Sequence, residues 1–334
     1  MTDETVIARK DGRIGRILMN RPKALNALDI GMIRAIATAL EQWREDPQVH
    51  AVVIEGAGER AFCAGGDIRA VRQSSLDGHT GDVEAFFAEE YALNGVIAAY
   101  PKPYIALVDG ICMGGGIGVS VHGAYRVASE HAMFAMPETA IGFFPDIGAS
   151  YFLPRLPGSV GMYLALTGAR VLGSDAVHAG LATHYTPRAR IGALSAALAQ
   201  DGMAALGRFA ETVPAGTLSA QHDAIERCFS AASVPEVFQR LEAEGGDWAT
   251  ATLATLRAMS PSSLHWSYQL IRAGADRTLG ECLATELKLT RTVSRHPDFL
   301  EGVRAMVVDK DRQPKWQPAR IEAVEPARIS QMFA

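Results

Sequence analysis

The first half of the chain alternates apolar runs of strand length with amphipathic segments of helix length. Three runs have the composition of buried strands: 13–20 (RIGRILMN), 50–58 (HAVVIEGAG) and 103–113 (PYIALVDGICM). Between the first two runs, apolar side chains from Met32 to Trp43 recur at helical spacing, and Asp29 is suited to cap that helix. Strands and helices alternate to about Thr186, which predicts an α/β layer structure with parallel strand pairing.

Polar and helical stretches separate the second strand from the third. Residues 61–71 (AFCAGGDIRAV) predict a turn that leads into a helix, and residues 83–100 (VEAFFAEEYALNGVIAAY) predict a helix that ends at Pro101. The polar stretch between them, 72–82 (RQSSLDGHTGD), is the best candidate for a mobile loop. Residues 125–138 (YRVASEHAMFAMPE) predict two short strands joined by a turn.

After Pro187 the pattern becomes almost wholly helical. Six segments have helical spacing of apolar residues: 193–213, 224–233, 235–244, 248–260, 262–275 and 278–295. The basic, proline-containing tail 301–324 is expected to fold back on the protein. The chain is therefore predicted to have an α/β part over 1–187 and a mainly helical part over 188–334.

Composition and charge narrow the class of protein. With 334 residues, 48% of them hydrophobic and 21% charged, the chain has the composition of a folded globular protein. A formal net charge of −5 argues against a nucleic-acid partner. The chain has no apolar run of membrane character, and its start (MTDETVIARKDGRIG) resembles neither a signal nor a transit peptide. These observations predict a cytoplasmic protein without a membrane segment.

Several motifs suggest chemistry that their context does not support. The four cysteines are scattered and form no C-x-x-C pair, and no histidine spacing suits a metal, so no metal site is expected. GAGERA (56–61) lacks the helix that a dinucleotide site needs. In GVSVHG (118–123), His122 replaces the last glycine of a serine hydrolase elbow, so Ser120 is expected on an ordinary helix face.

Two glycine turns form a stronger candidate site. CAGGD contains Gly65 and Gly66, MGGGIG runs from Met113 to Gly118, and each turn follows a predicted strand. If those strands are neighbours, the backbone N–H groups of Gly66 and Gly115 converge on one oxygen and form an oxyanion hole. The alternative is that the glycines only permit tight turns, and the motifs favour neither interpretation.

Two carboxylates lie in the apolar segment MPETAIGFFPDIG. Glu138 follows Pro137 and Asp146 follows Pro145, and a helix cannot continue unbroken through the second proline. An apolar pocket would raise a carboxyl pKa and suit it to proton transfer. The residues alone favour the alternative, a pair of surface acids of which one caps a helix.

Five motifs together resemble the crotonase (enoyl-CoA hydratase/isomerase) superfamily: NRPKALNAL, AFCAGGDI, KPYIALVDG, MGGGIG and FAMPETAIGFFPDIG. The resemblance implies a crotonase-like spiral of ββα units, a helical C-terminal region and an acyl-CoA thioester substrate. By analogy, Gly66 and Gly115 form the oxyanion hole. The CAGGD turn and the next residue, through Ala64, Gly65, Asp67 and Ile68, would then bind coenzyme A.

Departures from the superfamily pattern select a branch. Gly118 stands where a typical hydratase carries a glutamate, Glu138 matches the second glutamate, and Asp146 replaces a common glycine. This pattern resembles the branch that hydrolyses 3-hydroxyisobutyryl-CoA in valine catabolism. FFAEEYALN and HPDFLEGVRAMVVDKDRQPKW also resemble that branch. The resemblance implies that Glu138, Asp146, Glu90 and Gly115 contact the substrate.

The branch implies a catalytic role for each carboxylate. Glu138 would attack the thioester or activate water, Asp146 would assist, and Glu90 would bind the substrate hydroxyl unless it is an exposed helix residue. Basic residues that could hold the coenzyme A phosphates are Arg21, Lys23 and Lys310.

Coenzyme A is part of the substrate in this interpretation, so no cofactor is expected, and a homo-oligomer is possible. Two alternatives remain open. One is a hydratase or isomerase that acts on another acyl-CoA, and the other is a non-catalytic acyl-CoA binding protein.

Overall fold

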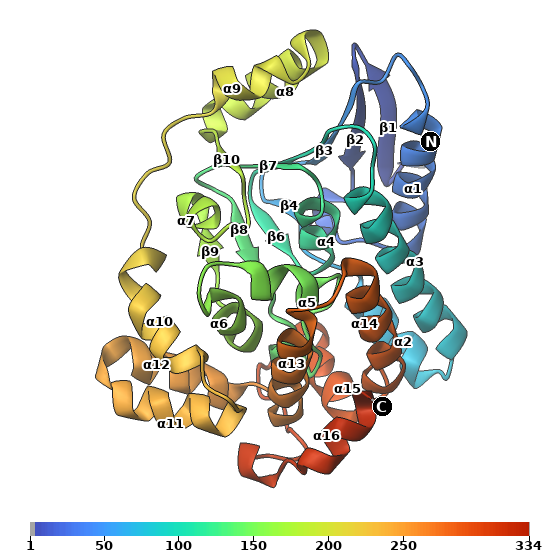
Figure 1. The fold of residues 1–334 in the computed structure, drawn as a ribbon. Helices are drawn as coiled ribbons and strands as arrows, with labels where there is room; N and C mark the ends of the chain where they lie inside the picture. The colour runs from blue at the N-terminus through green and yellow to red at the C-terminus, as the bar shows by residue number, and fades with distance from the viewer. Residues whose placement is uncertain (1–3, 334) are drawn as a thin grey trace. The chain divides into compact units, whose positions relative to one another are not determined.

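The computed structural model describes residues 4–333, shown in Figure 1. Contacts within the chain define two units. The sheet unit comprises Met1–Asp67, Glu89–Phe134 and Arg170–Ser219. The helical unit comprises Ile68–Ala88, Ala135–Ala169 and Ala220–Ala334. Because each unit takes three separate segments of the chain, neither is a continuous stretch of sequence. The predicted division at residue 187 stays a prediction.

Two sheets form the centre of the sheet unit. The six-stranded sheet has the order β1 (Val6–Asp11), β2 (Ile14–Met19), β3 (Ala51–Gly56), β5 (Tyr104–Val108), β7 (Tyr125–Ala128) and β10 (His184–Tyr185). The four-stranded sheet has the order β4 (Ala61–Cys63), β6 (Ile111–Met113), β8 (Met133–Ala135) and β9 (Val171–Leu172). From β2 to β10 every pairing in the larger sheet is parallel, which confirms the predicted strand pairing.

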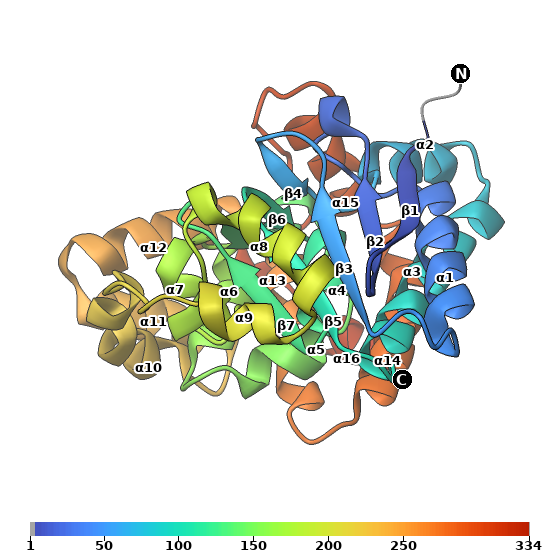
Figure 2. The ribbon, with the colours of Figure 1, turned by 90° about the horizontal axis from the view of Figure 1, so that it is seen from above.

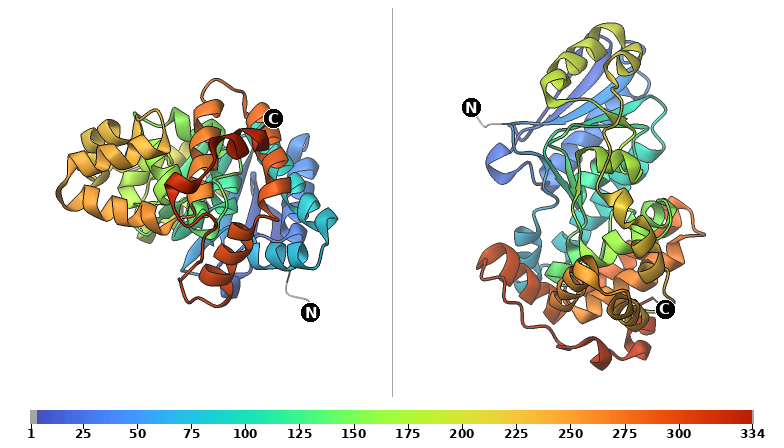
Figure 3. Two further views of the ribbon diagram at one scale, coloured as in Figure 1. Left: turned by 90° about the horizontal axis from the view of Figure 1, so that it is seen from below. Right: turned by 90° about the vertical axis from the view of Figure 1, so that its left-hand side faces the viewer.

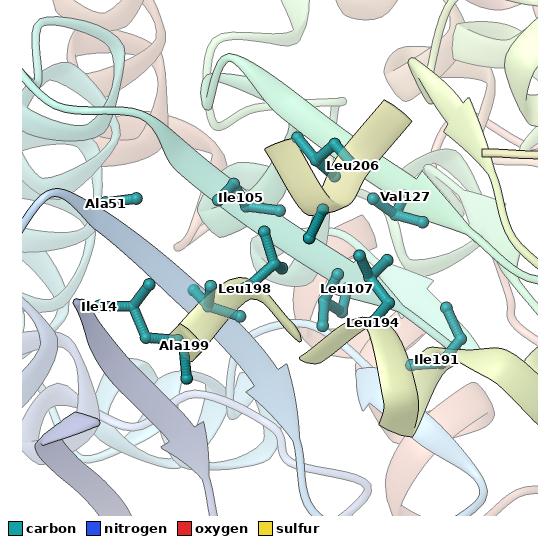
Figure 4. Packing of buried hydrophobic residues seen from close by; sticks show 12 residues of the cluster. Ile14, Ala51, Ile105, Leu107, Val127, Ile191, Leu194, Leu198, Ala199 and Leu206 are labelled. Carbon is teal, nitrogen blue, oxygen red and sulfur yellow. The ribbon is translucent and has the colours of Figure 1, made fainter. Parts of the chain in front are cut away.

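Helices cover both faces of the larger sheet. They are α1 (Ile30–Arg44), α4 (Gly115–Val121), α7 (Gly173–His178), α8 (Arg188–Asp201) and α9 (Ala204–Phe209). Figure 2 shows α8 and α9 crossing in front of the strands, and Figure 4 shows the apolar cluster that they form with β2, β3, β5 and β7. Ile14 belongs to this cluster, whereas the next residue, Gly15, faces the ring of Trp43 on α1. Successive residues of β2 therefore serve opposite faces of the sheet, as strand geometry requires.

The segment predicted as one strand over 103–113 is two strands in two different sheets. Gly110 separates β5 from β6 and has φ +106°, a conformation that other residues rarely adopt. A Cβ at Gly110 would lie 2.6 Å from the carbonyl oxygen of Arg60, so a side chain there would collide with backbone. The hydrophobic pattern missed this break because both strands are apolar.

The helical unit is built on α13 and the helices around it. Its helices are α2 (Ile68–Leu76), α5 (Ala149–Phe152), α6 (Val160–Thr167), α10 (His222–Phe229), α11 (Val234–Glu244), α12 (Gly246–Ala258), α13 (Pro261–Gly274), α14 (Leu279–Val293), α15 (Pro297–Val303) and α16 (Pro326–Phe333). Figure 3 shows these helices from two further sides. The helix α3 (Thr80–Ala98) begins in this unit and continues into the sheet unit. Every helix predicted after Pro187 is present, and the first of them is divided at Gly202 into α8 and α9.

The predicted mobile loop over 72–82 is wrong. Residues up to Leu76 belong to α2, and α3 begins at Thr80, so only a short turn separates two helices. The polar side chains of α2 make tertiary contacts: Arg72 Nε donates to the carbonyl of Leu300 at 2.7 Å, and Arg69 Nη2 donates to that of Val307 at 2.8 Å. A polar composition indicates a loop only when such partners are missing.

The basic tail folds back on the helical unit, as predicted. Trp316 Nε1 donates to the carbonyl of Ala258 at 3.0 Å, and the N–H of Gln317 donates to Asp298 Oδ1 at 2.7 Å. Ile321, further along the tail, is buried. No helix within residues 4–333 has the length and the apolar composition needed to cross a membrane.

Candidate active site

The two glycine turns lie together in the sheet unit. Strands β4 and β6 are parallel neighbours with Cys63 opposite Cys112, so the turns that follow them meet at the same end of the sheet. A Cβ placed on Gly115 would lie 3.3 Å from the backbone nitrogen of Gly66. The predicted side-by-side placement of Gly66 and Gly115 is confirmed, while their role in binding an oxygen stays a prediction.

Backbone hydrogen bonds fix the first turn around Gly66. They run from Ala64 N–H to Leu25 O (3.0 Å), from Leu28 N–H to Gly65 O (2.8 Å) and from Asp67 N–H to Leu28 O (2.8 Å). Gly115 is the first residue of α4, so its N–H has no carbonyl one turn earlier within the helix. The N–H groups of Ala64 and Asp67 are therefore used in hydrogen bonds within the protein. The N–H groups of Gly66 and Gly115 are better placed to donate to a ligand.

A buried carboxylate lies against Gly115. A Cβ at Gly115 would lie only 2.3 Å from Glu90 Oε1, and Glu90 is 2% exposed. The alternative of an exposed helix residue is therefore wrong. Burial, together with the charge of Glu90, raises the pKa of the nearby Cys63 thiol to about 12. The structure brings together Glu90, Gly115 and Gly66, all of which were expected to contact the substrate.

Among the residues proposed to bind coenzyme A, Arg21 and Asp67 form ion pairs within the protein. Arg21 pairs with Asp29 at 3.1 Å and with Asp67 at 3.4 Å. Lys23 and Lys310 are exposed, and Ile68 is the first residue of α2. The roles of Arg21, Lys23, Lys310, Asp67 and Ile68 toward coenzyme A stay predictions. Ser120 lies within α4 and donates to the carbonyl of Gly116 at 3.0 Å, which confirms its predicted place on a helix.

Glu138 and Asp146 are both buried in the helical unit. Glu138 begins the 3-10 helix η2 (Glu138–Ile141) and is 7% exposed, and Asp146 is 6% exposed. The interpretation of these two residues as surface acids is therefore wrong. Between them, the Phe143 ring stacks on Phe144 with 4.4 Å between centroids and packs against Phe299 at 5.4 Å. The segment between the two carboxylates is therefore part of an apolar cluster.

Helix α15 packs on the turn that carries Glu138. A Cβ at Gly302 would lie 2.4 Å from the carbonyl carbon of Ile141, so only glycine permits this approach. Ser260 N–H donates to the carbonyl of Thr139 at 3.2 Å, and Ser260 Oγ donates to Asp298 Oδ2 at 2.5 Å. Burial raises the pKa of Asp298. The tail motif that contains Asp298 and Gly302 thus has a structural function next to Glu138.

The sequence analysis missed Glu286, which holds the turn after Asp146. Glu286 is 0% exposed and accepts three hydrogen bonds: from Gly148 N–H (2.7 Å), Ser150 N–H (3.0 Å) and Ser150 Oγ (2.5 Å). Burial and, to a smaller extent, the charge of Asp146 raise its pKa against the effect of the three donors, and the resulting pKa is about 8. A signal existed in the sequence, because Glu286 falls on the face of α14 that also carries Cys282, Leu283 and Leu289.

The buried groups have defined chemical capacities. A pair of converging N–H groups stabilises negative charge on a carbonyl oxygen, and a buried carboxylate transfers protons or attacks as a nucleophile. Within residues 4–333, no three His, Cys, Asp or Glu side chains gather as a metal site would require.

Comparison with known proteins places these features in a family. A sequence profile described as enoyl-CoA hydratase/isomerase matches residues 14–333. The protein named 3-hydroxyisobutyryl-CoA hydrolase, mitochondrial, from Xenopus tropicalis is 46% identical over 357 residues, covering 100% of this chain and 91% of the relative. The protein of the same name from Homo sapiens is 42% identical, covering 99% of this chain and 88% of the relative.

Solved structures share the fold over nearly the whole chain. A carnitinyl-CoA dehydratase from Mycobacterium thermoresistibile superposes with a TM-score of 0.95 at 38% identity, covering 99% of this chain and 97% of that one. An enoyl-CoA hydratase from Rhodobacter sphaeroides superposes with a TM-score of 0.94 at 39% identity, with the same coverage. These likenesses confirm the predicted crotonase-like fold class.

The names of the vertebrate relatives contradict the predicted cytoplasmic location, because those proteins are named mitochondrial. That prediction is wrong. It rested on the lack of an apolar run of membrane character and on the first 15 residues, of which the first three lie outside the described part of the chain. Residues Val6–Asp11 form β1, so their composition reflects the needs of the sheet and gives no information about targeting.

Proposed function

We propose that this chain, which belongs to the enoyl-CoA hydratase/isomerase family, hydrolyses the thioester 3-hydroxyisobutyryl-CoA to 3-hydroxyisobutyrate and coenzyme A. Relatives named 3-hydroxyisobutyryl-CoA hydrolase are 41% to 46% identical to it along nearly the whole chain. A role in valine degradation, as the sequence resemblance implies, is part of the proposal. The reaction consumes the thioester and water, so the proposal includes no separate cofactor. A homo-oligomer stays a prediction.

The observation that carries the proposal is the contact of Glu90 with Gly115 beside Gly66. The two glycine N–H groups would bind the thioester oxygen, which becomes an oxyanion when the carbonyl is attacked. The Glu90 carboxylate would accept a hydrogen bond from the 3-hydroxyl group of the acyl chain. A hydroxyacyl thioester offers both partners, whereas an enoyl thioester offers no hydroxyl.

Glu138 and Asp146 would supply the remaining chemistry. Either Glu138 attacks the carbonyl and water then hydrolyses the resulting anhydride, or Glu138 removes a proton from the attacking water. In both routes the carbon–sulfur bond breaks and the thiolate of coenzyme A takes up a proton. Asp146 would hold the water. Gly118 cannot transfer a proton, which supports hydrolysis over water addition by paired glutamates.

A hydratase is the second candidate, because the two solved structures with the same fold over the whole chain are named a hydratase and a dehydratase. The two functions predict different products.

Purified protein is mixed with 3-hydroxyisobutyryl-CoA and, separately, with crotonyl-CoA. A thiol reagent follows free coenzyme A, and absorbance follows the enoyl group. We expect thiol release from the first substrate and no change in the second. Loss of enoyl absorbance without thiol release would contradict the proposal.

Replacement of Glu138 tests the assigned chemistry. We expect Glu138→Gln to lower kcat for thiol release by at least about 10³-fold, because an amide neither attacks a thioester nor accepts a proton from water. The far-UV circular dichroism spectrum should remain that of the wild type. Turnover within tenfold of the wild type would show that Glu138 is not the catalytic carboxylate.

A further inference from the structure

We propose that Glu286 is a positioning residue, which holds the turn after Asp146 in the conformation that hydrolysis requires. The inference rests on the function proposed above, since Asp146 has its role there. Glu286 lies on α14, and its carboxylate is wholly buried. It would act through Asp146 without touching the substrate.

All three donors to Glu286 belong to the turn that follows Asp146. One carboxylate oxygen accepts from Gly148 N–H, and the other accepts from both the N–H and the hydroxyl of Ser150. Ala149 N–H, between these two residues, donates to the carbonyl of Asp146 at 2.8 Å. The carboxylate and the backbone thus fix residues 146–150 as one rigid turn.

This turn has a backbone that needs external support. Ile147 has φ +54° and Gly148 has φ +80°, so two consecutive residues are left-handed. The left-handed region is unfavourable for a β-branched residue such as isoleucine, and such strain persists only where surrounding contacts enforce it. Glu286 accepts hydrogen bonds from the N–H groups of Gly148 and Ser150, which follow Ile147, so it supplies contacts of this kind. Without them, the turn would relax and Asp146 would move with it.

A glutamate kept only for packing would not need this arrangement. A buried carboxylate is costly, and an apolar side chain of similar size fills a core at less cost. Here the burial of Glu286 and the charge of Asp146 both raise its pKa, so the fold retains a destabilised group. The hydrogen bonds that Glu286 accepts from Gly148 and Ser150 explain why a buried carboxyl group is retained here.

Two substitutions at this contact separate positioning from packing. Glu286→Gln keeps the shape, and at a pH above about 8, where Glu286 is ionised, it replaces an accepting oxygen by an amide NH₂ that points toward one of the donors. Ser150→Ala removes only the hydroxyl donor. Glu281→Gln is the matched control, because Glu281 lies on the same helix in an exposed capping box with Thr278. It should lower stability slightly and leave kcat unchanged.

The assay is thiol release from 3-hydroxyisobutyryl-CoA, with amide hydrogen exchange of residues 146–152 as a readout that does not depend on activity. For Glu286→Gln we expect kcat to fall at least about tenfold with KM within about threefold, and exchange to become faster. Ser150→Ala should show a smaller fall in kcat. A Glu286→Gln protein with the kcat and the exchange of the wild type would overturn the proposal.

The outcomes separate this inference from the proposed function. If wild type and Glu281→Gln release no thiol, the proposed function fails, and hydrogen exchange alone then decides whether Glu286 holds the turn. If Glu286→Gln loses kcat only in proportion to a loss of folded protein, Glu286 is structural and the inference is overturned. If Glu286→Gln does not fold, Ser150→Ala gives the same test with a milder change.

Discussion

At the scale of single residues, Gly115 is the glycine whose replacement bears most directly on the proposed site. A Cβ there would collide with the flexible end of Glu90, at 2.3 Å, and would lie 3.3 Å from the backbone nitrogen of Gly66. Because the closest atom belongs to a side chain that can move, Gly115→Ala should fold with the Glu90 carboxylate displaced. We expect kcat/KM for the hydroxyacyl thioester to fall at least about tenfold, since a misplaced binding group loses substrate positioning.

A double substitution is the control for Gly115→Ala. In a Glu90→Ala background the colliding carboxylate is absent, so Gly115→Ala should cause little additional loss in kcat/KM. Losses that multiply in the double variant would mean that Gly115 and Glu90 act independently.

The buried Glu286 carboxyl should also give the stability of the protein a dependence on pH. Its pKa is raised to about 8, so between its ordinary value and about 8 the folded protein holds a proton that the unfolded chain releases. Stability from this group is therefore present at low pH and is lost as pH rises toward 8, with a slope of at most about 1.4 kcal/mol per pH unit.

Urea unfolding between pH 5 and 8 measures this contribution, with the wild type compared with Glu286→Gln. The wild type should lose more stability over this range than the variant, which has no titrating group at the site. Parallel stability curves would contradict the raised pKa.

The sequence drew attention to those candidate residues whose surroundings are local. Glu138 and Asp146 stand out because each follows a proline in an apolar segment, and both prove to be buried. Glu286 was missed because its donors, Gly148 and Ser150, lie 138 and 136 residues away along the chain. The pattern of residues around Glu286 cannot predict hydrogen-bond partners that are so distant in sequence.

At the scale of elements, the approach of α15 to the turn before Phe143 depends on Gly302. Gly302→Ala would place a methyl group against the backbone of Ile141, which cannot move as a side chain end could. We expect a loss of about 1–3 kcal/mol in the free energy of unfolding, as for other overpacked cores.

The matched control is Gly192→Ala in α8, where the added methyl group meets nothing within 4 Å. Alanine in a helix interior should stabilise the protein by about 0.5–1 kcal/mol. Urea unfolding midpoints measure both variants. Equal shifts for the two would show that the contact of α15 with Ile141 is loose.

Elements with regular periodicity were predicted well, and elements held by tertiary contacts were not. The cap of α1 is as expected, since Asp29 accepts a hydrogen bond from Met32 N–H at 2.8 Å. The second part of α2, from Arg72, was predicted to be a loop because the polar side chains of this helix have partners more than 200 residues away, the carbonyls of Leu300 and Val307.

At the scale of the whole molecule, the interleaving of the two units predicts how fragments behave. A fragment of residues 188–334 lacks Ile68–Ala88 and Ala135–Ala169, which belong to the helical unit. It would keep Glu286 without its donors and expose the apolar faces of α8. We therefore expect little helical circular dichroism and no cooperative unfolding. A cooperative transition would instead support an independent C-terminal domain with the predicted boundary.

The fold class was predictable from motifs, whereas the partition into units was not. Motifs identify a family and with it a known topology. A division of the chain by contacts depends on which distant segments pack together, and hydrophobic patterns describe only neighbours in sequence. The helical unit therefore takes up residues 68–88, which the sequence analysis had assigned to an α/β part.

The four free cysteines have a practical consequence for measuring turnover. All four side chains are buried, and burial raises the pKa of each thiol, so little reactive thiolate exists in the folded protein. A thiol reagent should therefore react very slowly with the folded protein. The absorbance of the reagent then measures released coenzyme A, with little background from the cysteines of the protein.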